Sequence, residues 1–298
     1  MGITRQQALD CFASDDLIGI GMEADAIRRT LHPESVVTYT LDRTLDATAS
    51  DLDAQIEDAL DAGVTGIYLR FAPATILDHL KVTLSKVKTL HPELTLQALT
   101  ATEILALAKA SGLSIPDIFT RLRDSGLDSL SGDDAPILDP TFSASSTCTP
   151  ADWLAIHRAA HHLGILTTAS MTFGNGETSE QRINHLDALR QLQQETTGFI
   201  AFIPTASAAQ APDDPTAVEY LKTLAISRLY LDNILNIQAS LETQGLKVLQ
   251  MGLRFGANDA GSLAPGDRTT EEDLRRVIRG AGFQPIQRDS PYRTFFLN

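Results

Sequence analysis

Apolar and polar positions along the chain follow two different periods. Apolar residues recur every three or four positions in 51–63 and 150–164, a spacing that predicts amphipathic helices. Between such segments lie short runs rich in β-branched and aromatic residues, including VVTYTL (36–41) and GFIAFIP (198–204), which predict strands. The second run is apolar at almost every position, as is typical of a parallel strand that is buried on both faces.

Helix and strand alternate in this way from residue 36 onward. Because crossover connections between parallel strands are right-handed, the alternation predicts an α/β fold with a parallel sheet. We expect a TIM-type (β/α) barrel, complete or incomplete, formed by residues 36–298 after an N-terminal helical extension of residues 1–35, in one domain. A doubly wound open sheet is the alternative, although no GxGxxG motif follows the first strand.

The charge of the chain limits its partners. The 298 residues carry a formal net charge of -14, which opposes binding to nucleic acid or to an anionic membrane. No uninterrupted apolar run is long enough to span a bilayer, and the polar run GITRQQ follows Met1. We therefore expect a cytoplasmic protein with neither a nucleic-acid nor a membrane partner.

In a (β/α) barrel the reactive side chains lie where strands end and the following loops begin. The residues after each expected strand therefore supply the candidates for the site. The candidates for catalysis are Asp133, Asp134, Glu177 and Arg43. The candidates for ligand binding are Arg70, Asn175, Thr178, Thr205, Asn258 and Asp259.

The acidic candidates each have a structural alternative. Asp133 and Asp134 would suit acid–base or metal chemistry as paired carboxylates, but Gly-Asp-Asp is also a common turn sequence. Glu177 opens a predicted helix, where the helix dipole stabilises a carboxylate by about 0.3–1 kcal/mol without any role in chemistry.

The two arginines also leave two interpretations open. Arg43 and Arg70 each follow an expected strand, and an arginine at a barrel mouth suits the carboxylate or phosphate of a ligand. The alternative is an ion pair with Asp42 or Glu103.

No metal site is predicted. His157 and His161 lie one helical turn apart, but the HExxH motif is absent, so a packed or solvated helix face is the expected setting. Cys11 and Cys148 are far apart and make no metal-binding spacing.

Several stretches resemble one enzyme family. They include LHPESVVTYTLDR, WLAIHRAAHHLGILTTASMTFGNGET, LAISRLYLDNILNIQAS and LRFGANDAGS. Together with others between about residues 4 and 293, they are similar to the menaquinone-pathway radical SAM enzymes, which include dehypoxanthine futalosine cyclase, aminofutalosine synthase and the FO synthase subunits. The resemblance implies a (β/α) barrel with a substrate pocket at its mouth.

The resemblance also implies a CxxxCxxC loop after the first strand, whose three thiolates hold a [4Fe–4S] cluster that binds S-adenosylmethionine (SAM). Here that place reads DRTLDATASDLDA, and no cysteine lies between Cys11 and Cys148. Other positions depart as well: Pro136 replaces a glutamate, and Asn175 replaces a histidine of the family pattern. The sequence therefore predicts a member of the family with no [4Fe–4S] cluster and no SAM as cofactors.

Two functions remain open at this point. The first is a pseudoenzyme or repurposed small-molecule-binding protein related to menaquinone biosynthesis, whose partners are a ligand at the barrel mouth and a second copy or an active homologue. The second is a non-radical lyase, isomerase or cyclase that acts by acid–base chemistry on a small acidic or nucleoside-like substrate. A pocket in which a carboxylate and an arginine converge favours the enzyme, whereas a mouth collapsed onto Phe71 and Pro73 favours the binding protein.

Overall fold

The computed structural model describes residues 2–132, 134–135, 137–143, 147–207, 216–266 and 268–294. The helices are α1 (Arg5–Ala13), α2 (Leu17–Leu31), α3 (Leu52–Asp61), α4 (Leu77–Leu90), α5 (Ala101–Ser111), α6 (Ile115–Asp124), α7 (Pro150–His162), α8 (Ser179–Thr196), α9 (Ala217–Tyr230), α10 (Leu241–Gly252) and α11 (Glu271–Gly280). The strands are β1 (Val36–Asp46), β2 (Gly66–Arg70), β3 (Thr95–Ala98), β4 (Ser129–Leu130), β5 (Leu166–Phe173), β6 (Phe199–Ala206), β7 (Asn236–Ile237), β8 (Asp259–Leu263) and β9 (Gln284–Gln287).

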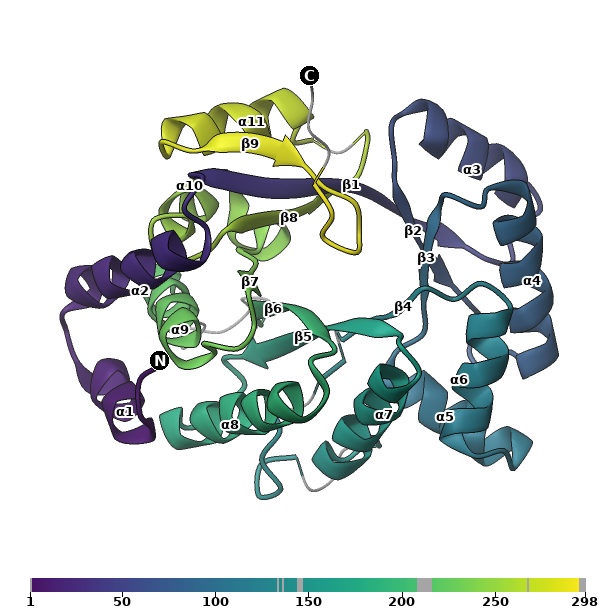
Figure 1. Ribbon diagram of the computed structural model, residues 1–298, viewed down its shortest axis with the longest axis horizontal. Coiled ribbons are helices and arrows are strands. Elements are labelled where there is room, and N and C mark those ends of the chain that lie inside the picture. Colours follow the sequence, from purple (N-terminus) through teal and green to yellow (C-terminus); the bar gives the residue numbers. More distant parts are fainter. Residues whose placement is uncertain are drawn as a thin grey trace.

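The strands form a parallel sheet that curls into a barrel. Their order is β7-β6-β5-β4-β3-β2-β1-β8, and β9 adds to the first part of β1. The two ends of this order, β7 and β8, meet at a single bridge between Gln238 and Asp259, which closes the ring through a narrow seam. Figure 1 shows the strands as an inner ring with helices around it. The predicted (β/α) barrel is confirmed, and the open doubly wound sheet is excluded.

The helices begin where the sequence supplies capping residues. Thr149 caps α7 and forms a capping box with Asp152, and Pro150 occupies the first turn, where its missing N–H costs nothing. Thr178 caps α8 in the same way together with Gln181. These caps satisfy backbone N–H groups that would otherwise lack partners, so they fix where each crossover turns back along the barrel.

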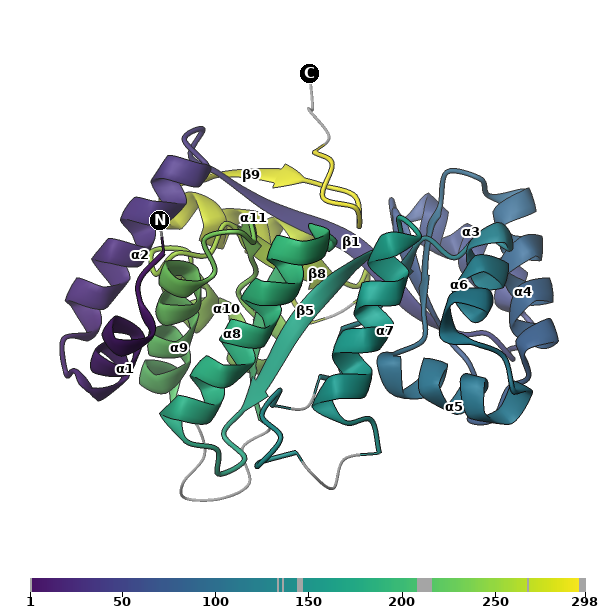
Figure 2. The same cartoon turned by 60° about the horizontal axis from the view of Figure 1, so that its bottom comes forward.

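The helical extension at the N-terminus packs on the outside of the helix layer, where α1 and α2 lie against α9 (Figure 2). The approach of α2 is close because Gly21 has no side chain: a Cβ there would lie 2.6 Å from the ring of Phe255. Lys222 on α9 donates from Nζ to the backbone oxygens of Phe12 and Ser14 at the end of α1. The predicted extension is therefore confirmed as helical.

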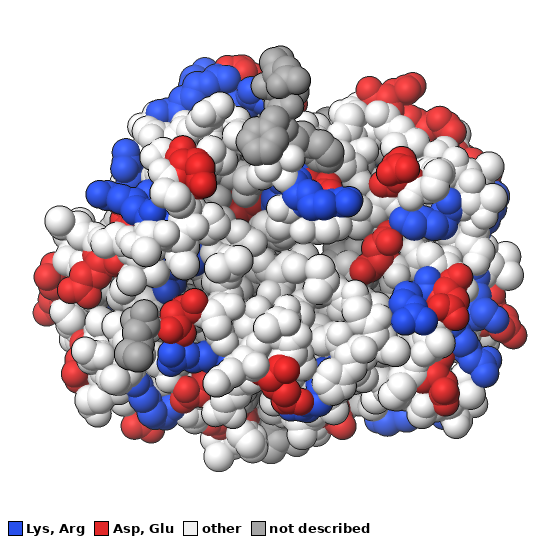
Figure 3. All heavy atoms as spheres, in the orientation of Figure 1, with Lys and Arg blue, Asp and Glu red and all other residues white. Residues whose placement is uncertain are grey.

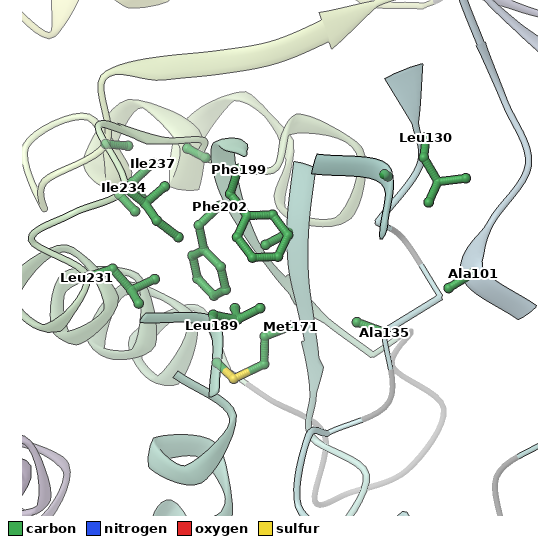
Figure 4. Packing of buried hydrophobic residues seen from close by; sticks show 14 of the residues in the cluster. Ala101, Leu130, Ala135, Met171, Leu189, Phe199, Phe202, Leu231, Ile234 and Ile237 are labelled. Atoms are coloured by element: carbon green, nitrogen blue, oxygen red, sulfur yellow. The ribbon is translucent and has the colours of Figure 1, made fainter. Parts of the chain in front are cut away.

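The main core lies between the strand ring and the helices, not inside the ring. Figure 4 shows Phe199, Phe202 and Met171 from β5 and β6 packed with Leu189 of α8 and Leu231 at the end of α9. All five are buried. Because these outward-facing positions carry the large apolar side chains, the barrel interior is left to smaller and more polar ones.

Two strands differ from the sequence prediction. β1 continues to Asp46, five residues beyond the expected end, because 42–46 pair in register with β2. The alternation of apolar residues in QMGLRFGAN (250–258) predicts another strand, but this segment contains the end of α10 and a turn, and β8 begins only at Asp259. Apolar Leu253 and Phe255 pack in the core rather than in a ladder, so alternation alone misplaced this strand.

Within the described ranges, no helix is both long enough and apolar enough to cross a membrane.

Candidate functional site

A cavity of about 1170 Å³ lies inside the strand ring and extends to the ends of the strands. Exposed side chains of Thr44, Arg70 and Arg268 line it, so it opens to solvent. Fourteen of the 33 described lining residues are serines or threonines: Thr40, Thr44, Thr100, Ser129, Ser131, Thr168, Ser170, Thr172, Thr205, Ser240, Thr243, Ser262, Thr269 and Ser290. Each of these hydroxyls can donate a hydrogen bond to a polar group of a ligand or accept one from it.

The pleat of β1 decides which of its residues face this cavity. Thr40, Asp42 and Thr44 line it, whereas Leu41 and Leu45 point outward and are buried in the core. Side chains alternate between the two faces of a strand, so the extension of β1 beyond residue 41 directs Asp42 inward. Asp42 is therefore part of the barrel wall and not of a loop.

Asp42 lies among polar side chains at one end of the cavity. Its Oδ1 accepts hydrogen bonds from the hydroxyls of Thr40 and Ser290, each at 3.1 Å. Gly66, opposite Asp42 in β2, must be glycine, because a Cβ would lie 2.6 Å from Asp42 Oδ1 and 2.1 Å from Ser290 Oγ. Burial raises the pKa of Asp42; the guanidinium of Arg288 opposes this rise, and Asp259 adds to it.

Beside Asp42 lies a buried ion pair between Asp259 of β8 and Arg288, which follows β9. Arg288 donates to both carboxylate oxygens of Asp259, at 2.5 and 2.9 Å, and neither side chain is more than 4% exposed. The Asp259 carboxylate also accepts from Thr38 Oγ1 at 2.5 Å and from Gly261 N at 2.8 Å. Burial acts to lower the pKa of Arg288, but Asp259, Tyr292 and Asp42 together outweigh burial and raise it.

The segment after β9 brings this pair into the barrel. The guanidinium of Arg288 lies 3.6 Å from the ring centroid of Tyr292, whose hydroxyl donates to Gln238 Oε1 at 3.3 Å. Arg288, Ser290 and Tyr292 all line the cavity, and Figure 1 shows the yellow segment after β9 bending over the inside of the strand ring. We call Asp42, Asp259, Arg288, Ser290 and Tyr292 the floor cluster.

The opposite end of the cavity carries arginines. Arg70 ends β2, and Arg268 lies in the connection from β8 to α11; both line the cavity, and we call them the rim arginines. Neither forms an ion pair with a residue that the structure describes. Asp42 pairs with Gly66, the first residue of β2, and Arg70 is the last residue of β2. At about 3.3 Å per residue, floor and rim are therefore about 13 Å apart along the strand.

Arg43 also lines the cavity but is already engaged. Its Nη1 donates to Asp58 of α3 at 2.6 Å, and its Nη2 reaches the backbone oxygen of Pro265 at 3.4 Å. The ion-pair alternative therefore holds for Arg43, although the partner is Asp58 and not Asp42 or Glu103. Arg43 follows Asp42 in β1, and its guanidinium reaches from the edge of the cavity to α3 and to the connection after β8.

Other candidates lie away from the cavity and satisfy backbone or buried groups. Asp134 accepts from Thr102 N, at the start of α5. Glu177 accepts from the backbone N–H of Gly174 and of Asn175 and from Arg182. Burial would raise the pKa of Glu177, but these donors outweigh burial and lower it. The predicted catalytic roles of Asp134 and Glu177 therefore gain no support from the geometry.

The predicted ligand-binding residues divide in the same way. Arg70 and Thr205 line the cavity. Asn175 and Thr178 do not: Thr178 is the cap of α8. Asn258 accepts from Arg228 Nη2 and from Ile237 N, and so holds the seam between β7 and β8. Asp259 does not line the cavity, but it holds Arg288, which does. Asp133 lies outside the described residues.

The histidines form a packed cluster. His157 and His161 both hydrogen-bond to Thr167 Oγ1, at 2.9 and 2.8 Å, and His161 also contacts Thr196 Oγ1 at 2.7 Å. Trp153 stacks beside His157, with ring centroids 3.8 Å apart. Burial lowers the pKa of both histidines, that of His161 to about 4. The packed alternative is thus the setting observed, under α7 and away from the cavity.

Sequence reasoning missed Arg288, Tyr292, Gln238 and Arg268 as lining residues. Arg288 is more than two hundred positions from Asp42 in the chain, and no local pattern connects the two. Asp42 itself carried a signal: it continues the alternation Thr38, Thr40, Asp42 along one face of β1.

The chain resembles known proteins over most of its length. A family model described as the CofH/MqnC C-terminal region matches residues 196–296. The cyclic dehypoxanthine futalosine synthase of Streptomyces coelicolor is 30% identical, over 97% of this chain and 85% of that protein. The chain belongs to the CofH/MqnC family. The aminodeoxyfutalosine synthase of the same organism is likewise 30% identical to this family member, over 97% of the chain and 90% of the relative.

The resemblance stated from the sequence is therefore confirmed. The alignment with the first relative spans 338 positions, more than the 298 residues of this family member, so the relative has residues that this chain lacks. Among solved structures, methylornithine synthase superposes with a TM-score of 0.73 over 96% of the chain and 94% of that protein, at 14% identity. At that identity the similarity concerns the fold, and it agrees with the barrel described above.

Family membership corrects the prediction that the protein uses no cofactor. The family consists of radical SAM enzymes, so it points to a [4Fe–4S] cluster and SAM. The loop after β1 does not fit a cluster held by three cysteines, because Cys11 and Cys148 are the two cysteines of the chain. Burial raises the pKa of the Cys148 thiol to about 11. A cluster in this family member would therefore need ligands other than that cysteine motif.

Proposed function

We propose that this protein binds a small acidic, nucleoside-like molecule of the futalosine type in the barrel cavity. The observation that carries the proposal is the charge of the cavity against that of the whole chain. Of the four arginines that line the cavity, Arg43 pairs with Asp58 and Arg288 with Asp259, whereas the rim arginines Arg70 and Arg268 form no ion pair with a described residue; the whole chain carries -14. An anionic ligand is therefore attracted to the cavity and repelled by the remaining surface.

The shape and polarity of the cavity support the same class of ligand. An acidic group at the rim would meet Arg70 and Arg268, and a guanidinium binds a carboxylate through paired hydrogen bonds. Hydroxyls of a sugar-like part would meet the hydroxyl-lined wall. The two S. coelicolor relatives are named for cyclic dehypoxanthine futalosine and aminodeoxyfutalosine, which is why we take futalosine-type compounds as the first ligands to test.

The cavity is open, which bears on the choice between binding and catalysis. Phe71 is buried in the core, and neither Phe71 nor Pro73 lines the cavity. The mouth is not collapsed onto these residues, and a carboxylate and an arginine do converge at the floor. This arrangement favours an acid–base enzyme as the second candidate function, beside a protein that binds its ligand without converting it.

Isothermal titration calorimetry with dehypoxanthine futalosine and with aminodeoxyfutalosine tests the proposal. We expect saturable one-to-one binding, weakened about tenfold by Arg70→Gln, since a hydrogen bond to a charged group contributes about 1.5–3 kcal/mol. Arg121→Gln is the matched control, because Arg121 is exposed on α6 and does not line the cavity. Absence of heat for both compounds, or equal weakening by both variants, would contradict the proposal.

A further inference from the structure

The floor of the cavity holds a carboxylate whose surroundings are unlike those of the other acidic residues. Asp42 faces the cavity, yet most of its surface is covered by β1, β2 and the segment after β9. Its hydrogen-bond donors are two hydroxyls, from Thr40 and Ser290, and not a cation. Hydroxyl donors adapt to either protonation state of a carboxyl group, because a hydroxyl can also accept.

The charged groups that face Asp42 balance one another. Asp259 faces it from β8, and Arg288 and Tyr292 face it from the segment after β9. The charge of Asp42 contributes to raising the pKa of Tyr292. Arg288 is already bound to both oxygens of Asp259, so its positive charge is largely offset before it reaches Asp42. β2 contributes Gly66, which has no side chain. Asp42 is thus a half-buried carboxyl with a shielded arginine nearby, and it faces the cavity in which a ligand would bind.

We propose that Asp42 is the proton-exchanging residue of the cavity, and that its carboxyl donates a proton to an oxygen or nitrogen atom of the bound ligand. The inference rests on the proposed function, because it needs a ligand that reaches the floor. In the forward step the Asp42 O–H bond breaks and a bond from that proton to the ligand atom forms. The carboxylate left behind is stabilised by Arg288 and by the hydroxyls of Thr40 and Ser290. The reverse transfer restores the starting state, with no oxidant or reductant.

Several features agree with this assignment. Burial raises the pKa of Asp42, so it keeps its proton to a higher pH than an ordinary aspartate and is better matched to proton transfer near neutrality. Asp46, four residues further along β1, provides the contrast. It is exposed, does not line the cavity, and has its pKa lowered by hydrogen bonds from the side chain and backbone of Thr48.

Labelling with a small diazoacetamide tests the protonation of Asp42 without any ligand. The reagent takes the proton of a carboxylic acid at its diazo carbon, loses N2 and leaves an ester, so its rate follows the protonated fraction. At about pH 6.5 we expect at least about tenfold more ester at Asp42 than at Asp46, measured by peptide mass spectrometry, since one pKa unit is a factor of ten. Ser290→Ala removes a donor that stabilises the carboxylate, and it should increase labelling further. Equal or lower labelling of Asp42 overturns the proposal.

Calorimetry in two buffers of different ionisation enthalpy tests the exchange with a ligand. Binding of dehypoxanthine futalosine to the unaltered protein should change the number of bound protons. Asp42→Asn should still bind but with no proton exchange, and Asp46→Asn should behave like the unaltered protein. Unchanged proton exchange in Asp42→Asn refutes the inference. If no compound binds, the proposed function fails, and the labelling result still decides whether Asp42 is a protonated group open to the cavity.

Discussion

Replacement of Asp259 by asparagine would leave Arg288 as a buried guanidinium without a counter-charge. Each side chain of the pair is at most 4% exposed, and Arg288 donates two hydrogen bonds, of 2.5 and 2.9 Å, to the Asp259 carboxylate. Breaking a buried pair by removing one partner costs about 3–5 kcal/mol, because the remaining charge stays desolvated. The hydrogen bonds from Thr38 and Gly261 to Asp259 can survive in part with an amide oxygen. We therefore expect Asp259→Asn to lower the free energy of unfolding by about 3 kcal/mol.

Urea denaturation followed by circular dichroism measures this loss, with an unchanged slope showing that the same surface unfolds. The double variant Asp259→Leu with Arg288→Met should be less destabilised than Asp259→Asn, since apolar replacement of both partners leaves no buried charge. The exposed pair of Lys86 and Asp53 is the control, and Asp53→Asn should lower the free energy of unfolding by at most about 1 kcal/mol. A loss below about 1 kcal/mol for Asp259→Asn would refute the view that the floor cluster depends on this ion pair.

Three further predictions concern other parts of the barrel. Because the folded protein holds His161 neutral with a pKa of about 4, the unfolded chain binds more protons below about pH 6.5. Stability should therefore fall by about 2 kcal/mol between about pH 7.5 and pH 5, and His161→Gln should flatten this fall in urea titrations; an unchanged slope with pH would count against it. Gly66→Ala should lower the melting temperature and reduce the free energy of unfolding by about 1–3 kcal/mol, because the added Cβ meets Ser290 Oγ at 2.1 Å. Ser290→Gly should restore part of this loss, and unchanged stability of Gly66→Ala would show that the floor can shift. Asn258→Ala should lower the free energy of unfolding by about 3 kcal/mol, because it leaves two buried hydrogen-bond donors unpaired. Ligand affinity should be unchanged at temperatures where the variant is folded, and weaker binding would instead support the predicted role of Asn258 in the site.

The centre of the face drawn in Figure 3 is largely uncharged, and the Lys, Arg, Asp and Glu side chains gather toward its periphery. The charge count of the whole chain therefore says little about the cavity, where arginines outnumber acidic residues among the described lining positions.

Local patterns in the sequence were sufficient for the layout of the barrel. Thr149 with Pro150, and Thr178 with Gln181, mark helix starts through backbone capping, which depends only on neighbouring residues. The all-apolar run 198–204 predicted a strand buried on both faces, and it forms most of β6. Capping residues and apolar runs involve only a few neighbouring residues, so they can be recognised from the sequence alone.

The site depended on distant pairings instead. Asp42 faces the cavity because residues 42–46 extend β1 and pair with β2. The apolar run 36–41 does not predict this extension. Arg288 reaches the same place because β9 adds to β1, which brings the last part of the chain over the interior of the barrel. The sequence thus determined the elements and the family, since capping, periodicity and motifs are local. The fold alone determined which polar residues share the cavity, because that grouping follows from strand register and closure, and neither is written in any single segment.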